Sequence, residues 1–166
     1  MSLEFCNGIN TLTGANGIGK TNILDAVHYL ANAKSYFNGI DSQLIQHQQA
    51  FFTIKGLFDG ELPAEILVQF ESGKKTIKKN DKHYPRLLDH IGLIQTVFIT
   101  PYDIELVLGG SEDRRKFIDL SLCQIDATYL KNLSTYKKAL DQRNALLKNM
   151  QGRFIDPDLM GSFDAK

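Results

Sequence analysis

The chain has 166 residues, of which 43% are hydrophobic and 23% charged; this composition excludes a disordered chain and leaves room for one domain, or one domain and part of a second. The 19 Lys and Arg residues balance the 19 Asp and Glu residues, so a generally basic protein is excluded and contact with nucleic acid requires a local patch. No apolar run approaches the roughly 18 residues of a membrane span and no signal peptide opens the chain, so we expect a cytoplasmic protein.

The first predicted elements are a strand, a glycine-rich loop and a helix. Residues 9–13 are short, apolar and β-branched and lie between two glycines, which predicts a strand. Residues 14–21, Gly-Ala-Asn-Gly-Ile-Gly-Lys-Thr, match the phosphate-binding P-loop. From residue 20 to about residue 33, apolar residues recur at helical spacing. This order of elements is the context in which the loop motif is specific for nucleotide binding.

Each position of the loop has a chemical reason. Gly14 and Gly19 permit tight turns that direct backbone N–H groups towards phosphate oxygens. The following helix adds the positive end of its dipole, Lys20 can reach the β- and γ-phosphates, and the Thr21 hydroxyl can ligate Mg²⁺. Asn22 is either a polar contact near the metal or an ordinary first-turn residue. The predicted ATP-binding residues are Gly14, Ala15, Asn16, Gly17, Ile18, Gly19, Lys20, Thr21 and Asn22, with Mg²⁺ on Thr21.

The middle of the chain has the pattern of a sheet. Residues 34–50 predict a loop with a helical turn near residues 41–45. Three strand-like runs follow at residues 51–58, 66–71 and 76–79, and their turn residues suit an antiparallel meander. Residues 93–100 form a further apolar run that Pro101 ends, which predicts another strand.

After Gly109 and Gly110 the pattern becomes helical. Ser111 is predicted as the N-cap, and two acidic residues follow it where the helix dipole favours them. A second helix is predicted from about residue 127 to residue 150. Its apolar residues share one face: Leu133, Tyr136, Leu140 and Leu147. The fold class is therefore α/β, with a domain at residues 1–110 and a helical arm or lid at residues 111–166.

Two groups of cations are candidates for contact with DNA. The densest basic stretch contains Lys74, Lys75, Lys78 and Lys79, and it can follow a DNA backbone or protect the edge of a sheet from aggregation. Arg114 and Arg115 open a helix, where cations oppose the dipole. They can pair with a carboxylate such as Asp113 or Asp119, or they can meet DNA or phosphate.

Other potentially reactive residues are assigned structural roles. We expect His28 to be a packing or surface residue, and Cys6 and Cys123 to be reduced and buried. Hydrolysis of a nucleotide requires a carboxylate at the end of an apolar strand, and neither residues 66–68 nor residues 97–99 are followed by one. We therefore predict no catalytic residue within these 166 residues, and at best weak nucleotide binding without turnover for this chain alone.

The chain resembles the RecF family of bacterial DNA repair proteins, and especially its Bacteroidetes members. The resemblance covers most of the chain in the family's order, and its most specific segment is the run from Thr100 to Asp119. The motifs are INTLTGANGIGKTNILDAVHYLANAKSYF, DSQLI, FITPYDIELVLGGSEDRRKFIDLSLCQID and YKKALDQRNALLK. Two features depart from the family pattern: an aromatic and basic opening element is missing, and Lys34 to Asn38 replace an Arg-Ser-Phe-Arg segment.

The resemblance implies an ATPase head of the ABC/SMC type with an inserted helical arm. The chain would be its N-terminal part, truncated at both ends, with the Walker B and signature motifs in the missing half. The family's members bind ATP, dimerise around it and bind DNA at gaps or single-strand/double-strand junctions. They work with RecO and RecR in loading RecA, and a slow DNA-stimulated ATPase is expected of the full-length protein. The matching positions are the P-loop residues, Asp103, Arg114 and Arg115.

Two other functions remain as alternatives. In an SMC-like structural tether the helical arm would matter more than the head, and such a tether needs a long heptad-rich coiled coil, of which residues 127–150 supply about three heptads. In an unrelated P-loop kinase, residues that bind a phosphate acceptor would be required beyond the loop. Nucleotide turnover with and without gapped DNA separates the three functions.

Overall fold

The computed structural model describes residues 1–60, 63–149, 161 and 163. The chain divides into two compact units, Met1–His90 and Ile91–Lys166. The first unit contains the P-loop and the sheet, and the second contains the long helices. The predicted division at residue 110 stays a prediction about the domains of the full-length protein.

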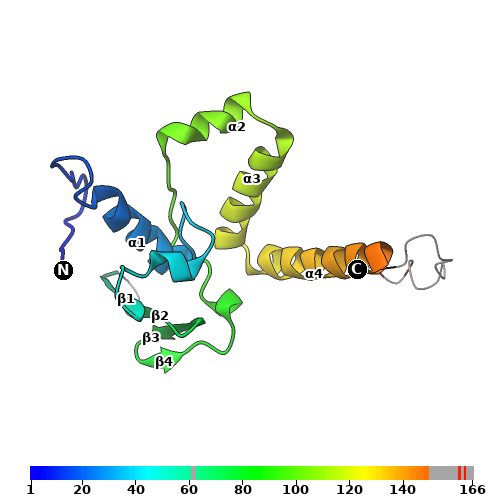
Figure 1. The fold of residues 1–166 in the computed structure, drawn as a ribbon, viewed down its shortest axis with the longest axis horizontal. Helices are drawn as coiled ribbons and strands as arrows, with labels where there is room; N and C mark the ends of the chain where they lie inside the picture. The colour runs from blue at the N-terminus through cyan, green and yellow to red at the C-terminus, as the bar shows by residue number, and fades with distance from the viewer. Residues whose placement is uncertain (61–62, 150–160, 162, 164–166) are drawn as a thin grey trace. The chain divides into compact units, whose positions relative to one another are not determined.

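An antiparallel sheet forms the body of the first unit. Its strands are β1 (Phe51–Phe58), β2 (Ala64–Glu71), β3 (Lys74–Lys79) and β4 (Lys82–His83), and they lie in the order of the sequence (Figure 1). Two-residue turns join the last three strands. Ser72 and Gly73 have φ angles of 50° and 76°, and Asn80 and Asp81 have φ angles of 49° and 62°. Positive φ at both central residues defines a type I′ turn, whose twist matches that of the flanking strands.

One face of this sheet packs against helix α1 (Lys20–Asn32). Strand β2 buries alternate residues, with Ile66 and Val68 fully inaccessible, as expected where one face of a strand meets a core. The C-terminal half of α1 supplies Tyr29 and Leu30 to the same core. A Cβ atom at Gly56 would lie 2.7 Å from Leu30 Cδ1, so the missing side chain lets the helix approach the sheet closely.

The second unit begins with an extended segment and continues as helices. Its short elements are η3 (Pro101–Ile104) and α2 (Glu105–Leu108), and its long helices are α3 (Ser111–Ile125) and α4 (Ala127–Asn149) (Figure 1). The η3 turn begins with a capping box in which Thr100 and Asp103 satisfy each other's backbone N–H groups. The 3₁₀ turns η1 (Asp41–Leu44) and η2 (Leu87–Asp89) belong to the first unit.

A glutamine side chain holds the extended segment before η3. Thr96 donates its backbone N–H to Gln124 Oε1 at 2.7 Å, and Gln124 Nε2 donates to the Thr96 carbonyl at 3.1 Å. Gly92 lies against the same turn of α3, because a Cβ atom there would lie 2.6 Å from the Gln124 carbonyl oxygen. Its φ of 87° also favours glycine. The segment is thus fixed to the C-terminal end of α3.

Most predicted elements are confirmed, but two predicted strands are wrong. Helix α1, the turn near residue 41, the meander and both long helices occur where the sequence predicts them. Residues 9–13 and 93–100 form no strand. A strand is defined by hydrogen bonds to a neighbour, and among the described residues neither segment has a neighbouring strand. In residues 93–100 the exposure still alternates along the chain as it does in a strand.

Two smaller expectations need correction. Ser111 is the first helical residue of α3, and Gly110 occupies the N-cap position. Cys6 is exposed, with its thiol 3.3 Å from Asn10 Oδ1, whereas Cys123 is buried as predicted. The apolar face of α4 is exposed at Tyr136, to 55%. Met150, the predicted end of this helix, lies outside the described residues.

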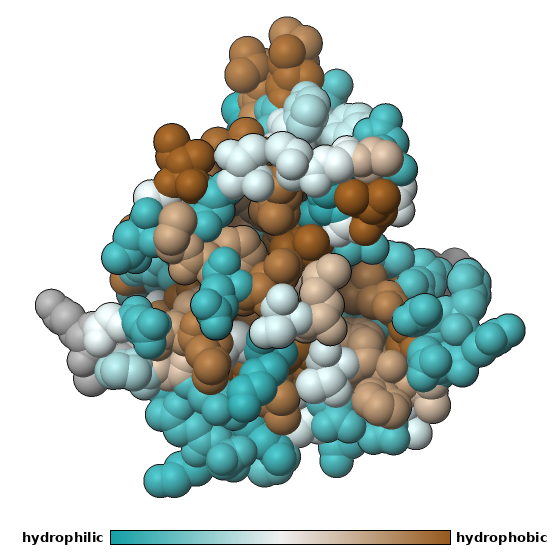
Figure 2. All heavy atoms as spheres, turned by 90° about the vertical axis from the view of Figure 1, so that its left-hand side faces the viewer, coloured by the Kyte–Doolittle hydropathy of each residue, from teal (hydrophilic) through white to brown (hydrophobic). Residues whose placement is uncertain are grey.

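Hydrophobic side chains are also exposed elsewhere, and Figure 2 shows them as brown spheres between hydrophilic ones. In the first unit they include Ile18 and Leu24, on either side of the start of α1, and in the second unit Val97 and Ile99. No helix in the described part of the chain has both the length and the apolar character needed to cross a membrane.

Candidate phosphate-binding loop

The glycine-rich loop is compact and leads directly into α1. Gly14, Gly17 and Gly19 have φ angles of 143°, 85° and 97°, which non-glycine residues rarely adopt. Gly19 is the left-handed N-cap of α1, and no side chain caps this end of the helix. A Cβ atom at Gly14 would lie 2.4 Å from Cδ1 of the exposed Ile18 side chain, which would have to move aside. The predicted loop conformation is therefore present.

The Lys20 side chain folds back over the loop. Its ammonium group donates to the carbonyl oxygen of Gly14 at 2.8 Å and to that of Ala15 at 2.7 Å. These two bonds place the charge at the centre of the turn that the glycines form. An anion placed at that centre would meet the ammonium charge and the positive end of the α1 dipole together.

The loop is open to solvent on its helix side. Thr21 and Asn22 are exposed, and the first turn of α1 contains no acidic residue that would repel an anion. The Thr21 hydroxyl, in the first turn, is thus available as a ligand for Mg²⁺. The residues from Gly14 to Thr21 therefore offer amide donors, an ammonium group and a hydroxyl, which suit a metal-bound polyphosphate.

The C-terminal end of α1 is fastened by side chains from β3 and from the end of the first unit. Lys75 Nζ donates to the Ala33 carbonyl at 2.6 Å and lies 2.8 Å from Asp41 Oδ2. The Tyr29 hydroxyl donates to Asp41 Oδ1 at 2.6 Å, and burial together with this bond raises the pKa of Tyr29. His90 Nε2 lies 2.7 Å from the Leu30 carbonyl. Cations and donors at a helix C-terminus satisfy carbonyls that have no partner in the helix.

The carboxylate of α1, Asp25, holds the loop that follows the helix. Asp25 Oδ2 accepts from the Ser35 hydroxyl at 2.6 Å, and Asp25 Oδ1 accepts from the Tyr36 backbone N–H at 2.8 Å. Ser35 Oγ in turn accepts from the Asn38 backbone N–H at 3.0 Å. His28 is buried, as expected for a packing residue, and its Nδ1 lies 3.0 Å from the Lys34 carbonyl.

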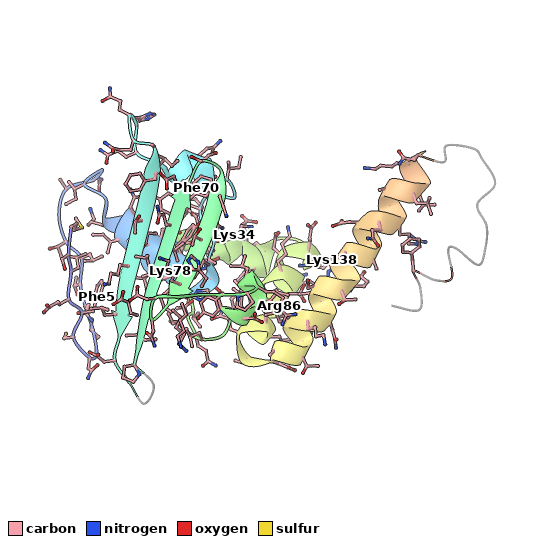
Figure 3. The ribbon with its side chains drawn as sticks, turned by 90° about the horizontal axis from the view of Figure 1, so that it is seen from below. Phe5, Lys34, Phe70, Lys78, Arg86 and Lys138 are labelled. Atoms are coloured by element: carbon pink, nitrogen blue, oxygen red, sulfur yellow. The ribbon has the colours of Figure 1, made fainter. Side chains whose placement is uncertain are left out.

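The predicted basic stretch is divided between the two faces of the sheet. Lys75 and Lys79 pair with Phe70 and Ile66, which are buried on the face towards α1. Lys74 and Lys78 point to the opposite face, since side chains alternate along a strand. Figure 3 labels Lys78 and Phe70 on the strands that carry them. The ammonium of Lys75 is engaged within the protein, so DNA contact is proposed below for Lys74 and Lys78.

The arginine pair of α3 makes contacts that differ from the expected carboxylate pairing. Arg114 Nη1 donates to the Gly109 carbonyl at 2.9 Å, and so satisfies the end of α2. Lys116 Nζ forms an ion pair with Glu112 Oε1, one turn earlier in the helix, at 2.8 Å. The Tyr129 hydroxyl donates to Asp119 Oδ1 at 2.6 Å. Arg115 is exposed. Asp113, the other candidate partner, lies 3.9 Å from Lys116 Nζ.

Sequence reasoning missed the residues that hold the loops around α1. Asp25, Asp41 and His90 make contacts to residues 11, 12 and 60 positions away in the sequence. Hydrophobic periodicity identifies the buried face of a helix, but it does not identify which loop returns to that face. A carboxylate in the middle of an apolar helical segment, as at Asp25, is the signal that could have indicated a polar partner.

Comparison with known proteins matches the chain to one family model and to relatives that share one name. The family described as AAA domain matches residues 1–155. The DNA replication and repair protein RecF of Phocaeicola vulgatus is 49% identical over 162 residues, which cover 95% of this chain and 43% of that protein. The protein of the same name in Flavobacterium johnsoniae is 48% identical over 147 residues, covering 87% of this chain and 41% of that protein.

Solved structures agree with these sequence relatives. A structure described as the recombination mediator protein RecF-ATPrS in the RecFOR pathway superimposes with a TM-score of 0.90 at 33% identity, covering 98% of this chain and 44% of that one. A second structure, described as RecF-ATP, gives a TM-score of 0.87. The chain thus spans less than half the length of the relatives it matches. It belongs to the AAA domain family, and its relatives are RecF proteins, as the sequence motifs predicted.

Proposed function

We propose that residues 14–22 bind the phosphates of ATP, and that the full-length protein uses bound ATP to dimerise on DNA. The geometry of the loop carries this proposal: the glycines stand in left-handed conformations, α1 begins at Lys20, and the Lys20 ammonium already lies within the turn. The relatives named for DNA replication and repair, and the solved structures named RecF-ATP and RecF-ATPrS, support the same assignment.

Each residue of the loop has a defined task in this proposal. Backbone N–H groups of the loop and of the first turn of α1 hold phosphate oxygens, and the Lys20 ammonium exchanges its two carbonyl partners for the β- and γ-phosphates. Thr21 is the residue that would hold Mg²⁺, which neutralises the phosphate charge when it is bound. The γ-phosphate is the group that distinguishes ATP from ADP, so contacts to it can drive a change of state.

At the level of the whole protein, we propose that ATP closes a homodimer on gapped or junction DNA and that hydrolysis reopens it. The protein would act with RecO and RecR in loading RecA during recombinational repair. This part follows from the RecF relatives and from the pathway named for the solved structures. The mechanism requires residues beyond this chain, since the chain spans 43% of such a relative.

Substitution of Lys20 tests the proposal. Lys20→Met in the full-length protein keeps the stem of the side chain and removes the charge, so ATP affinity should fall at least about tenfold. ATP-dependent dimers on DNA should disappear with it. Binding of a fluorescent ATP analogue and mass photometry on gapped DNA measure the two effects. Lys131→Met, which removes an exposed lysine from α4, is the matched control. Dimers that persist on DNA in Lys20→Met would refute the ATP-driven mechanism.

A further inference from the structure

A polar contact on α1 links the loop after this helix to the nucleotide end of the proposed site. Thr21 and Asp25 are four residues apart in one helix, so their side chains are neighbours on the same face, about 6 Å apart along the axis. The Asp25 carboxylate accepts from both Ser35 and the backbone N–H of Tyr36. These residues of the loop therefore lie on the Thr21 face of the helix.

Several side-chain contacts hold this loop against α1. Ser35 is 3% exposed. Its hydroxyl donates to the Asp25 carboxylate and accepts from the Asn38 backbone N–H. The His28 ring, one turn further along α1, contacts the Lys34 carbonyl and packs edge-on against Tyr36 with ring centroids 5.6 Å apart. Lys34 and Phe37 nevertheless remain exposed. The contacts fix the backbone of the loop, the Phe37 ring packs against Tyr36 with ring centroids 5.2 Å apart, and the Lys34 side chain lies at the surface.

We propose that Asp25 is a positioning residue for the γ-phosphate end of the nucleotide, acting through residues 34–38. This inference rests on the proposed ATP site and concerns how that site distinguishes ATP from ADP. In the proposed geometry, Thr21 holds the metal that bridges the β- and γ-phosphates, so the Thr21 face is the face nearest to the γ-phosphate. ADP has no group at that position. Fixing the loop should therefore favour ATP and leave ADP binding largely unchanged.

The test makes the same substitution at two carboxylates, Asp25 of α1 and Asp41 of η1. Asp25→Asn replaces one acceptor oxygen by an NH₂ group that cannot accept from Ser35 or Tyr36. Asp41→Asn makes the same change at the carboxylate that holds Tyr29 and Lys75, at the other end of the helix. ATP and ADP affinities of the full-length protein are measured by isothermal titration calorimetry with Mg²⁺, together with thermal unfolding.

The expected result is a change in nucleotide preference for one variant only. Asp25→Asn should lower ATP affinity about tenfold and ADP affinity less than about twofold, whereas Asp41→Asn should keep the wild-type ratio even where it lowers the melting temperature. Ser35→Ala removes the other half of the same hydrogen bond without altering α1, and should reproduce the shift if Asp25→Asn folds poorly.

Three outcomes would overturn the inference. An unchanged ATP-to-ADP ratio in both Asp25→Asn and Ser35→Ala would show that the loop does not act on the γ-phosphate. Equal losses for ATP and ADP would show that Asp25 supports the helix alone. If the wild-type protein binds neither nucleotide, the proposed site itself is wrong, and this failure is distinguishable because it precedes any substitution.

Discussion

His90 lies in the core of the first unit with a hydrogen bond at one ring nitrogen. Its Nε2 faces the Leu30 carbonyl at 2.7 Å, so Nε2 carries the proton and Nδ1 is left as an acceptor. Nδ1 is buried without a hydrogen-bond partner. Burial is the main cause that lowers the pKa of His90 below 6.5, and the nearby Lys79 ammonium also lowers it. The neutral form is therefore the one that fits the folded structure.

We predict that the stability of the protein decreases in mildly acidic solution and that His90 accounts for part of the decrease. Because the pKa of His90 is below 6.5 when folded, the unfolded chain binds a proton in the window below pH 6.5 that the folded chain does not bind. Stability is then fully present above this window and decreases through it as the pH falls, by at most about 1.4 kcal/mol per pH unit for one proton.

His90→Gln keeps a side-chain N–H donor for the Leu30 carbonyl and removes the titration. Urea unfolding of the full-length protein at about pH 7.5 and about pH 5.5 should show a smaller decrease in the variant than in the wild type. His28, whose pKa burial also lowers, contributes part of the remaining slope. His47→Gln, at an exposed position, serves as the control. Identical slopes in the wild type and His90→Gln would contradict the assignment.

At the scale of elements, two lysine–carboxylate pairs within the described residues join different elements and differ mainly in burial. Lys75 and Asp41 are 2.8 Å apart with side chains 22% and 20% exposed, whereas Lys55 and Glu65 are 2.9 Å apart with side chains 52% and 33% exposed. The first pair joins β3 to η1, and Lys75 also donates to the Ala33 carbonyl at the C-terminal end of α1. The second pair joins two neighbouring strands across the exposed face.

We predict different losses of stability when each lysine is removed. Lys75→Met should destabilise the protein by roughly 2–3 kcal/mol, because it leaves a partly buried carboxylate and a carbonyl without their donor. Lys55→Met should cost less than about 1 kcal/mol, because water replaces the lost partner. Chemical unfolding of both variants measures the difference. Equal losses would mean that the network around Asp41 does not fasten α1.

Local patterns were sufficient for elements whose partners are adjacent in sequence. The alternation in β1 and β2 and the turn residues between the strands determine the meander, because each strand pairs with its neighbour along the chain. Helical spacing likewise predicted α1 and α4. Residues 9–13 have an equally strand-like composition, but no neighbouring strand pairs with them in the described part of the chain. A pattern that indicates an extended conformation does not specify the partner that turns it into a strand.

The candidate site divides in the same way. The loop conformation around Lys20 follows from a local motif, since the glycines and the helix start are consecutive. The contacts of Asp25 and Lys75 were not predictable, because they depend on how the chain returns after α1. For Arg114 and Arg115 the sequence left open a carboxylate partner or contact with DNA or phosphate, and the backbone carbonyl that Arg114 contacts was not predicted. Of the two candidate carboxylates, Asp119 accepts from Tyr129 and Asp113 lies 3.9 Å from Lys116 Nζ.

At the scale of the molecule, the neutral overall charge makes any DNA contact depend on local clusters. Lys74 and Lys78 lie on the face of the sheet opposite α1, and neither forms an ion pair within the described residues. We predict that Lys74→Glu together with Lys78→Glu weakens DNA binding by the full-length protein. The dependence of the logarithm of affinity on the logarithm of salt concentration should become less steep by about two.

Fluorescence anisotropy with gapped DNA over a range of salt concentrations measures this slope. ATP affinity should be unchanged in the double variant, since the two lysines are not part of the P-loop. Lys131→Glu provides a charge-reversal control in the second unit. An unaltered slope in the double variant would assign the two lysines to the protection of an exposed sheet edge.

The paired hydrogen bonds between Gln124 and Thr96 have a consequence for how a sheet could grow around residues 93–100. Within an extended segment, the N–H and C=O of one residue point to the same side. Both groups of Thr96 are already saturated by the Gln124 amide. A strand that pairs with this segment at Thr96 would therefore have to do so along its opposite edge. The Gln124 side chain thus occupies, at Thr96, the backbone groups that a neighbouring strand on that edge of the segment would need.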